Sequence, residues 1–175
     1  LIGDLESAGS DWEDLTRRMN DPKAWRTTGS WTFDGKAVHG DGIAAREFLG
    51  RLPSDCVVQL RMTVMKGNHT HFYLADSPAG GTCNFGCEGK TAPRLKIRGK
   101  GTSGESGPGH IVKLNEEMRV KLAFKKNRVT AWVNNAMAST AVRANSGVRF
   151  KILVGVGKNS GSSSYWDFRV SPDGK

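Results

Sequence analysis

Long apolar runs are missing from this sequence of 175 residues. No stretch approaches the roughly 20 apolar residues that cross a bilayer as a helix, so we expect no membrane insertion. Cysteine is scarce as well, and three cysteines are too few for a disulfide scaffold. Cys83 and Cys87 are close enough in sequence to close a small loop in an oxidising compartment. Cys56 opens an apolar strand face, where we expect a buried small hydrophobe.

Acidic residues are few after the N-terminal segment. Residues 1–50 hold six Lys/Arg against nine Asp/Glu, so the rest of the chain carries +12 within a net charge of +9. Glycosidic cleavage generally needs two carboxyl groups about 5–10 Å apart. Glu116 and Glu117 are adjacent and would face opposite sides of a strand. Asp76, Glu88 and Glu105 fall in expected loops and would serve catalysis only if they converge, so an enzyme is the less favoured hypothesis.

Several motifs that would define a function are absent from the sequence. There is no helix-turn-helix, zinc finger or ribonucleoprotein signature, and charge alone is a weak signal, so we expect no nucleic-acid partner. There is no Gly-x-Ser-x-Gly elbow and no phosphate loop. His69 and His71 have a spacing that suits a metal, but ordinary surface histidines are favoured. Asp-Gly pairs at Asp34, Asp41 and Asp173 are read as turns; no cofactor is expected, with calcium left open.

Period-two alternation of apolar residues is the main positive signal. It predicts a meander over Met118–Thr140, with turns at Lys125–Asn127 and Asn134-Asn135, and a long strand over Asp55–Met65. Abundant glycine and about a dozen short strands at 8–12-residue spacing are typical of a β-sandwich or jelly roll. We therefore predict an all-β jelly-roll β-sandwich of two antiparallel sheets, formed by residues 1–175 as a single domain.

Other stretches give more local expectations. Asp11–Met19 is the only segment with helical character, and Asp41-Gly42 reads as a turn. Long loops are expected at Asp76–Thr91 and Gly99–Gly109, with a further Gly/Ser loop at Lys158–Ser164. The closing strand, Tyr165–Val170, is expected to place Trp166, Phe168 and Val170 on one face.

The Trp-rich start, the stretch RVTAWVNN and the closing YWDFRV together resemble the concanavalin A-like lectin and glucanase superfamily. Within it, the chain looks most like laminin-G-like domains and bacterial 3-keto-disaccharide hydrolase-like domains. The resemblance spans about Trp25 to Val170. It implies two antiparallel sheets packed face to face, one of them concave on its outer side, with sugars bound on that surface or in its rim loops.

Two departures from the family pattern bear on activity. Laminarinase-type glucanases carry a Glu-x-Asp-x-x-Glu strand, and no such strand exists in this sequence. The 3-keto-disaccharide hydrolase-like domains commonly place an acid on the strand after the long loop. The matching stretch is Arg94-Leu95-Lys96-Ile97, which is basic, so the resemblance does not carry hydrolase activity over.

The outward faces of the predicted strands suggest a ligand. Sugars are recognised by aromatic rings that stack on the sugar and by planar polar groups that bind its hydroxyls, and arginine suits anionic groups. We expect a non-catalytic carbohydrate-binding module whose partner is a polysaccharide or oligosaccharide, with an anionic glycan as one option. A glycoside hydrolase and a structural or protein-interaction domain are the alternatives. The expected ligand-binding residues on the concave sheet face are Gln59, Arg61, His71, Tyr73, Arg94, Lys96, Arg98 and Trp132.

The setting of the domain is also an expectation. The sequence begins at Leu1 rather than Met, which fits a mature product or a domain excised from a larger polypeptide. We expect an exported bacterial protein, periplasmic or extracellular, in which other domains of the same polypeptide are further partners.

Overall fold

A computed structural model describes residues 12–16, 18, 20–50, 52–67, 70–76, 82–88, 94–98, 103–142, 150–155 and 158–171; for residues 70–76, 82–84, 87, 88, 98 and 103–106 it describes the backbone alone. All the regular elements in this part of the chain are strands, so it contains no helix that would cross a membrane. The strands are β1 (Glu13–Asp14), β2 (Trp25–Phe33), β3 (Val38–Phe48), β4 (Cys56–Lys66), β5 (Thr70–Asp76), β6 (Thr82–Glu88), β7 (Arg94–Arg98), β8 (Ser103–Ser106), β9 (His110–Ile111), β10 (Glu117–Lys125), β11 (Arg128–Val133), β12 (Ala136–Val142), β13 (Lys151–Val154) and β14 (Gly161–Ser171).

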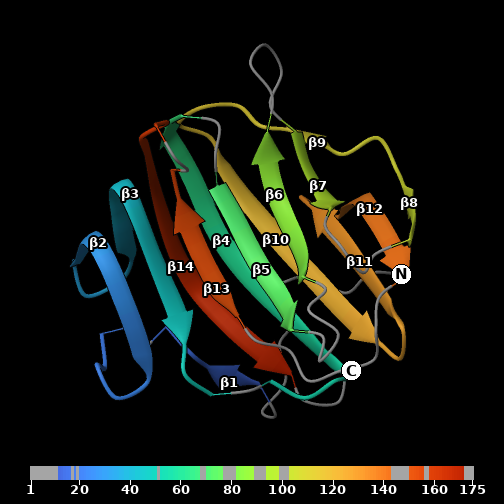
Figure 1. The fold of residues 1–175 in the computed structure, drawn as a ribbon, viewed down its shortest axis with the longest axis horizontal. Helices are drawn as coiled ribbons and strands as arrows, with labels where there is room; N and C mark the ends of the chain where they lie inside the picture. The colour runs from blue at the N-terminus through green and yellow to red at the C-terminus, as the bar shows by residue number, and fades with distance from the viewer. Residues whose placement is uncertain are drawn as a thin grey trace.

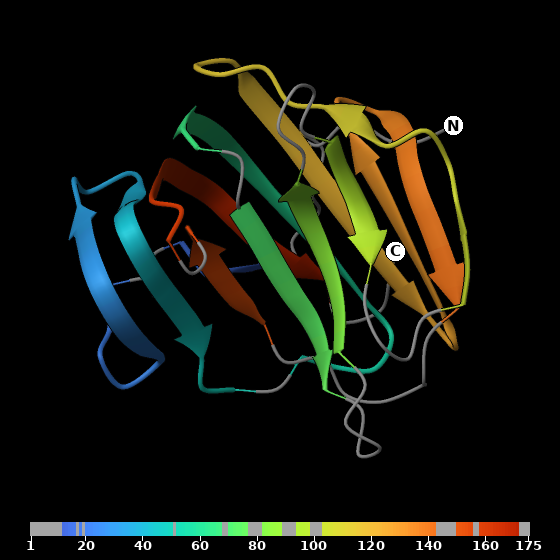
Figure 2. The same ribbon diagram turned by 45° about the horizontal axis from the view of Figure 1, so that its top comes forward.

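The strands form two antiparallel layers that pack face to face (Figures 1 and 2). The front layer is β13-β5-β6-β7-β9, and the back layer is β14-β4-β10-β11-β12-β8. The hairpin of β2 and β3 joins both layers at one flank, and β1 pairs with β14. This arrangement confirms the predicted jelly-roll sandwich.

Strand β3 is shared by the two layers. Its first half pairs with β14, from Val38 to Gly42, and its second half pairs with β13, from Ala44 to Glu47. Gly42 lies at the division with a φ of 76°, a conformation that glycine adopts without strain. The turn predicted at Asp41-Gly42 was wrong because this glycine bends a continuous strand instead of ending it.

The core lies between the layers and follows the predicted alternation. On β10, Val120, Leu122 and Phe124 are buried, and their neighbours on β4 are buried in register. The turns of the meander are also confirmed: Lys126 has a φ of 52°, and Asn134 and Asn135 have φ values of 50° and 67°. Positive φ at both central residues is the geometry of the tight hairpin turns that suit twisted strands.

The closing strand departs from alternation at Asp167, which has a φ of 51°. The register of β14 against β4 shifts between Trp166 and Arg169, so an extra residue is accommodated as a bulge. Tyr165 and Phe168 are both buried, whereas Trp166 is only half-buried. The prediction that Trp166 shares a face with Phe168 was wrong because a bulge breaks the period of two. Strand β14 also begins within the expected loop Lys158–Ser164.

Three other expectations were wrong for a common reason, which is that pairing partners far along the chain overrode local composition. The expected helix at Asp11–Met19 contains β1, and Leu15 is buried with its N–H donating to the Phe168 carbonyl at 2.9 Å. Strand β6 lies inside the expected loop Asp76–Thr91, and β8 lies inside Gly99–Gly109.

Strand β6 also decides the geometry of Cys83 and Cys87. Both residues lie on this one strand, where four residues of rise separate their Cα atoms by about 13 Å. A disulfide needs Cα atoms within about 7 Å. The small bridged loop left open by the sequence is therefore excluded. Cys56 is buried, as expected.

Candidate functional site

The eight residues expected to bind a glycan do not share one surface. Strands β4 and β11 are joined through β10 in the back layer, whereas β5 and β7 are joined through β6 in the front layer. Alternation separates inward from outward positions but does not say which layer a strand joins, so the expected single face was wrong. The back layer holds Gln59, Arg61 and Trp132, and the front layer holds His71, Tyr73, Arg94, Lys96 and Arg98.

The front layer carries two rows of register partners on its outer side. A third row lies between these two and faces the core. Its register partners run from Ile152 through position 72 to Phe85 and Ile97, and Ile152, Phe85 and Ile97 are buried. We call the outer surface formed by the two rows the front face. One row is Arg26, Glu47, Lys151, Tyr73, Asn84 and Arg98, and the other is Thr28, Ala45, Leu153, His71, Gly86 and Lys96.

The front face spans six strands, in the spatial order β2, β3, β13, β5, β6 and β7. For His71, Tyr73, Asn84 and Arg98 the structure describes the backbone alone, so their side chains are not described and only their register positions are used. Six strands spaced about 4.8 Å apart give a surface about 24 Å across. The two rows contain four Lys or Arg and one acid, Glu47, so the front face is basic.

A hollow of about 240 Å³ lies at the β2 end of the front face. It is lined by Arg26, Thr28, Ala45, Glu47 and Lys151, which all belong to the two rows. The Arg26 guanidinium forms an ion pair with the Glu47 carboxylate. Hydroxyl, carboxylate and cationic groups therefore meet in one concave part of this surface.

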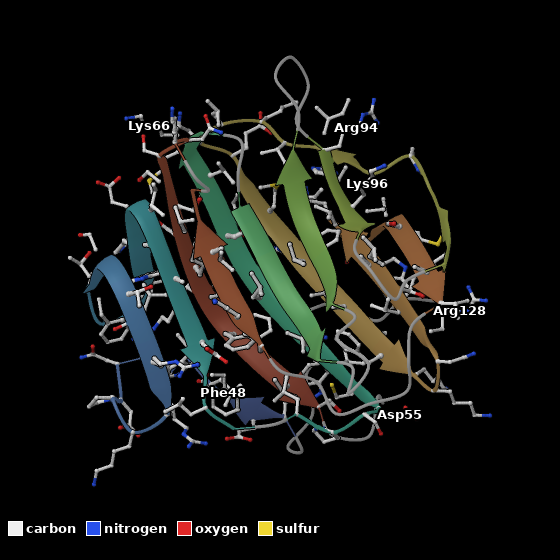
Figure 3. All side chains as sticks on the ribbon, in the orientation of Figure 1. Phe48, Asp55, Lys66, Arg94, Lys96 and Arg128 are labelled. Atoms are coloured by element: carbon white, nitrogen blue, oxygen red, sulfur yellow. The ribbon has the colours of Figure 1, made fainter. Side chains whose placement is uncertain are left out.

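At the opposite end, Arg94 and Lys96 project from β7 (Figure 3). Arg94 Nη1 donates to the Pro108 carbonyl at 2.7 Å, which ties β7 to the segment before β9. Lys96 is half-buried and pairs in register with Gly86. Arg94 therefore has a structural partner, whereas Lys96 belongs to the row that contains His71.

The back layer carries a second polar surface around Arg61, one of the expected residues. Arg61 Nη1 lies 2.9 Å from Glu117 Oε1, and its Nε lies 3.3 Å from Asp167 Oδ2. Asp167 Oδ1 is also 2.7 Å from Arg169 Nε. A pocket of about 460 Å³ beside this network is lined by Asp14, Thr16, Lys36, Arg61, Trp166, Asp167 and Arg169.

Sequence reasoning missed Trp166, Asp167 and Arg169 as members of this surface. They are exposed there because of the bulge in β14, which no alternation pattern reports. The one usable signal was Asp167, since aspartate is several-fold enriched among residues with positive φ. Aspartate is so common on strand ends and turns that this signal alone would not have located the bulge.

The other two expected residues on the back layer are already engaged within the protein. Gln59 is 6% exposed and therefore offers little surface. Trp132 is half-buried, and the Lys121 ammonium lies 5.7 Å from the centroid of its ring. A cation at that position is attracted to the ring face and covers it. On the back surface, therefore, Gln59 and the Trp132 ring are already occupied by contacts within the protein.

The carboxylates weighed for catalysis do not converge. Asp76 pairs with Thr82 at one end of the β5–β6 hairpin, and Glu88 lies at the other end, about 20 Å away along the strands. Glu105 lies on β8, which pairs with β12 at the edge of the back layer. The first two are too far apart for the carboxyl spacing of a glycoside hydrolase.

Asp34 belongs to one of the Asp-Gly pairs at which the sequence left a calcium ligand open. Its Oδ1 accepts the N–H groups of Lys36 and Ala37 at 2.8 and 2.7 Å, and its Oδ2 lies 3.0 Å from His39 Nε2. These hydrogen bonds hold the pKa of Asp34 well below its usual range. The carboxylate therefore fixes its own turn, and the described residues contain no group of three metal-ligating side chains. His69 and Asp173 lie outside the described residues.

No protein-family model matches this chain, and no curated protein matches it. Solved structures match along most of its length. They include the alginate lyase AlgAT5 of polysaccharide lyase family 7 (TM-score 0.64, 12% identity, 89% of this chain and 97% of that one) and a laminarinase from Flavobacterium (0.63, 11%, 91% and 98%). A third is the exoplasmic/lumenal domain of VIP36 in a Ca²⁺/Man-bound form (0.55, 10%, 82% and 83%). These likenesses establish the concanavalin A-like sandwich fold.

Proposed function

We propose that this concanavalin A-like sandwich is a carbohydrate-binding module that holds an acidic polysaccharide or oligosaccharide on its front face without cleaving it. The observation that carries the proposal is the pair of outer rows across six strands, which hold four Lys or Arg against one acid. Structural neighbours whose names include an alginate lyase, a laminarinase and a Ca²⁺/Man-bound form support a sugar partner. An exported location fits such a ligand.

The centre of the front face and its two sides have different roles in this proposal. Tyr73 and His71 occupy the centre, where a ring is best placed to stack on a sugar. Lys151 on one side and Lys96 and Arg98 on the other supply positive charge for carboxylate or sulfate groups. Gly86, between His71 and Lys96 in the register, carries no side chain and is itself buried.

The front face is preferred to the back surface because of how their charges are partnered. On the back layer, Arg61 and Arg169 share Asp167, and Lys121 covers Trp132. A ligand there would have to displace these contacts and restore their partners. On the front face, Lys96 and Lys151 stand in rows with a single acid. An anionic glycan would therefore bind more favourably to the front face than to the back surface.

A glycoside hydrolase of the same fold is the second candidate function, and the name of one structural neighbour, the laminarinase, favours it. In that case a front-face acid such as Glu47 would be required for turnover. Its ion pair with Arg26 places it at the hollow of about 240 Å³. Glu47→Gln tests this directly, because it preserves the size of the side chain and removes the carboxylate.

The deciding experiment is a glycan array probed at two salt concentrations, followed by turnover assays on the glycans that bind. Binding that weakens with salt and shows no turnover supports the proposal, since exposed charge pairs are screened. Turnover that is lost in Glu47→Gln supports the hydrolase. The absence of binding to any glycan would favour a structural or protein-interaction role.

A further inference from the structure

The β2–β3 hairpin contains a buried arginine, Arg46, which is only 5% exposed. It pairs with Thr27 on β2 and with the core residue Ile152 on β13. It therefore lies on the inner side of the hairpin, where an apolar residue would be the ordinary choice. A buried guanidinium in a core position requires an explanation, because taking a charge out of water is costly.

Two tryptophan rings flank this guanidinium. The Arg46 Cζ atom lies 5.9 Å from the centroid of the Trp25 ring and 5.6 Å from that of Trp31. The Trp31 indole is held in place, since its Nε1 donates to the carbonyls of Thr28 and Ala45 at 3.0 and 3.1 Å. Stacking on aromatic faces partly compensates the charge but provides no acceptor in the plane of the guanidinium.

Hydrogen-bond donors without acceptors are concentrated at this position. Arg46 Nε is buried and has no hydrogen-bond partner, and the same is true of Trp25 Nε1. Within the described residues, Arg46 forms no ion pair with any carboxylate. Burial lowers the pKa of the guanidinium, and no neighbouring charge opposes this effect. Buried donors of this kind are normally satisfied by protein, water or ligand.

A hollow of about 190 Å³ lies beside the residues that carry these groups. Arg46, Trp25 and Trp31 line it together with Thr27 and the Asn20–Pro22 segment. Asp21 contributes the one carboxylate in this lining, and its Oδ1 accepts the Lys23 N–H at 2.9 Å. The hollow therefore combines a cationic fork, a second N–H donor and aromatic walls.

We propose that this hollow binds an oxyanion, a carboxylate or sulfate group, through the Arg46 guanidinium, with the Trp25 indole N–H as a second donor. Arginine presents its donors in a fork that matches such oxygens. The size of the hollow suits a small acid or one acidic sugar substituent. The ligand would supply a carboxylate or sulfate partner for Arg46, which forms no ion pair with the described carboxylates, Asp21 in the lining included.

This site is separate from the front face. Neighbouring residues of a strand lie on opposite sides, so Thr27 and Arg46 line this hollow, while Arg26, Thr28 and Glu47 line the hollow on the front face. The proposal therefore stands whether or not the front face binds a glycan.

The test is a ¹H–¹⁵N NMR titration of the intact protein that follows the Trp25 indole Nε1–H and the Arg46 Nε–H. Sodium glucuronate and sodium sulfate are the probes, with glucose and sodium chloride at matched ionic strength as controls. We expect both signals to shift saturably with an oxyanion. Saturation by glucuronate alone would identify a sugar acid, whereas saturation by sulfate as well would identify a general oxyanion site.

Three variants complete the test. Arg46→Met should abolish saturation, and Arg46→Lys, which keeps the charge and removes the fork, should weaken binding about tenfold. Arg128→Met is the control, since it removes an exposed cation from β11 in the back layer, outside both proposed sites, and should leave the titration unchanged. Shifts that never saturate in the wild-type protein, or that persist unchanged in Arg46→Met, would overturn the proposal.

Discussion

The carbonyl oxygen of Gly42 lies so close to Gly155 that a side chain on Gly155 has no room. Gly155 also has a φ of 68°, at the point where β13 leaves the shared strand β3. We predict that Gly155→Ala lowers the free energy of unfolding by more than about 3 kcal/mol, because the backbone clash adds to the cost of a left-handed residue.

The matched control for this substitution is Gly35→Ala. Gly35 has a φ of 94° but no atom within 4 Å of an added Cβ. It should lose only about 1–2 kcal/mol, which is the conformational cost alone. Urea unfolding curves of the two variants measure the difference. Equal losses would show that the close approach at Gly42 is not a constraint.

Asp34 is predicted to stabilise the β2–β3 turn in a pH-dependent way. Its pKa is depressed in the folded protein by the N–H groups of Ala37 and Lys36. A depressed pKa contributes stability above the unfolded value, about 3.9, and this contribution is lost as the pH falls through the folded pKa. Asp34→Ala should lower the Tm by a few degrees at neutral pH, and the difference from wild type should shrink below about pH 4. Asp41→Ala, at an exposed site on the same hairpin, should show no such trend in thermal unfolding from pH 7 to pH 2.

The spacing of Cys83 and Cys87 on β6 predicts two free thiols. Under non-reducing conditions, both residues should react with a thiol-specific reagent in the unfolded protein. The Tm should be the same with and without a reductant, because no cross-link constrains the chain. Intact mass spectrometry of the labelled protein checks this, and a peptide in which the two cysteines are bridged would contradict the assigned strand.

Much of the fold was predictable because alternation is a local property of the sequence. Asp55–Met65, observed as Cys56–Lys66, and the meander around Leu122 were predicted as strands without any knowledge of their partners. The bulge at Asp167, the bend at Gly42 and the strand β6 were not predictable, since each depends on pairing with distant residues. Long-range pairing also explains why the expected binding residues divided between two layers.

Arg46 shows a different limit of the sequence. Its place in Ala44-Ala45-Arg46-Glu47 looks like an ordinary polar position on a strand. Only the folded structure, in which two tryptophans pack against it, reveals that it is buried. No local pattern distinguishes a buried arginine from an exposed one. The hollow beside Arg46 could therefore not be predicted from the sequence.

The central claim, that the front face binds an anionic glycan, is tested most directly by isothermal titration calorimetry with an acidic oligosaccharide selected from the array. Tyr73→Ala should weaken binding at least tenfold, because stacking and hydrogen bonds to a sugar are lost together. Trp132→Ala, which removes an aromatic from the back layer, should leave affinity within twofold. The reverse pattern, with Trp132→Ala abolishing binding and Tyr73→Ala leaving it intact, would contradict the account.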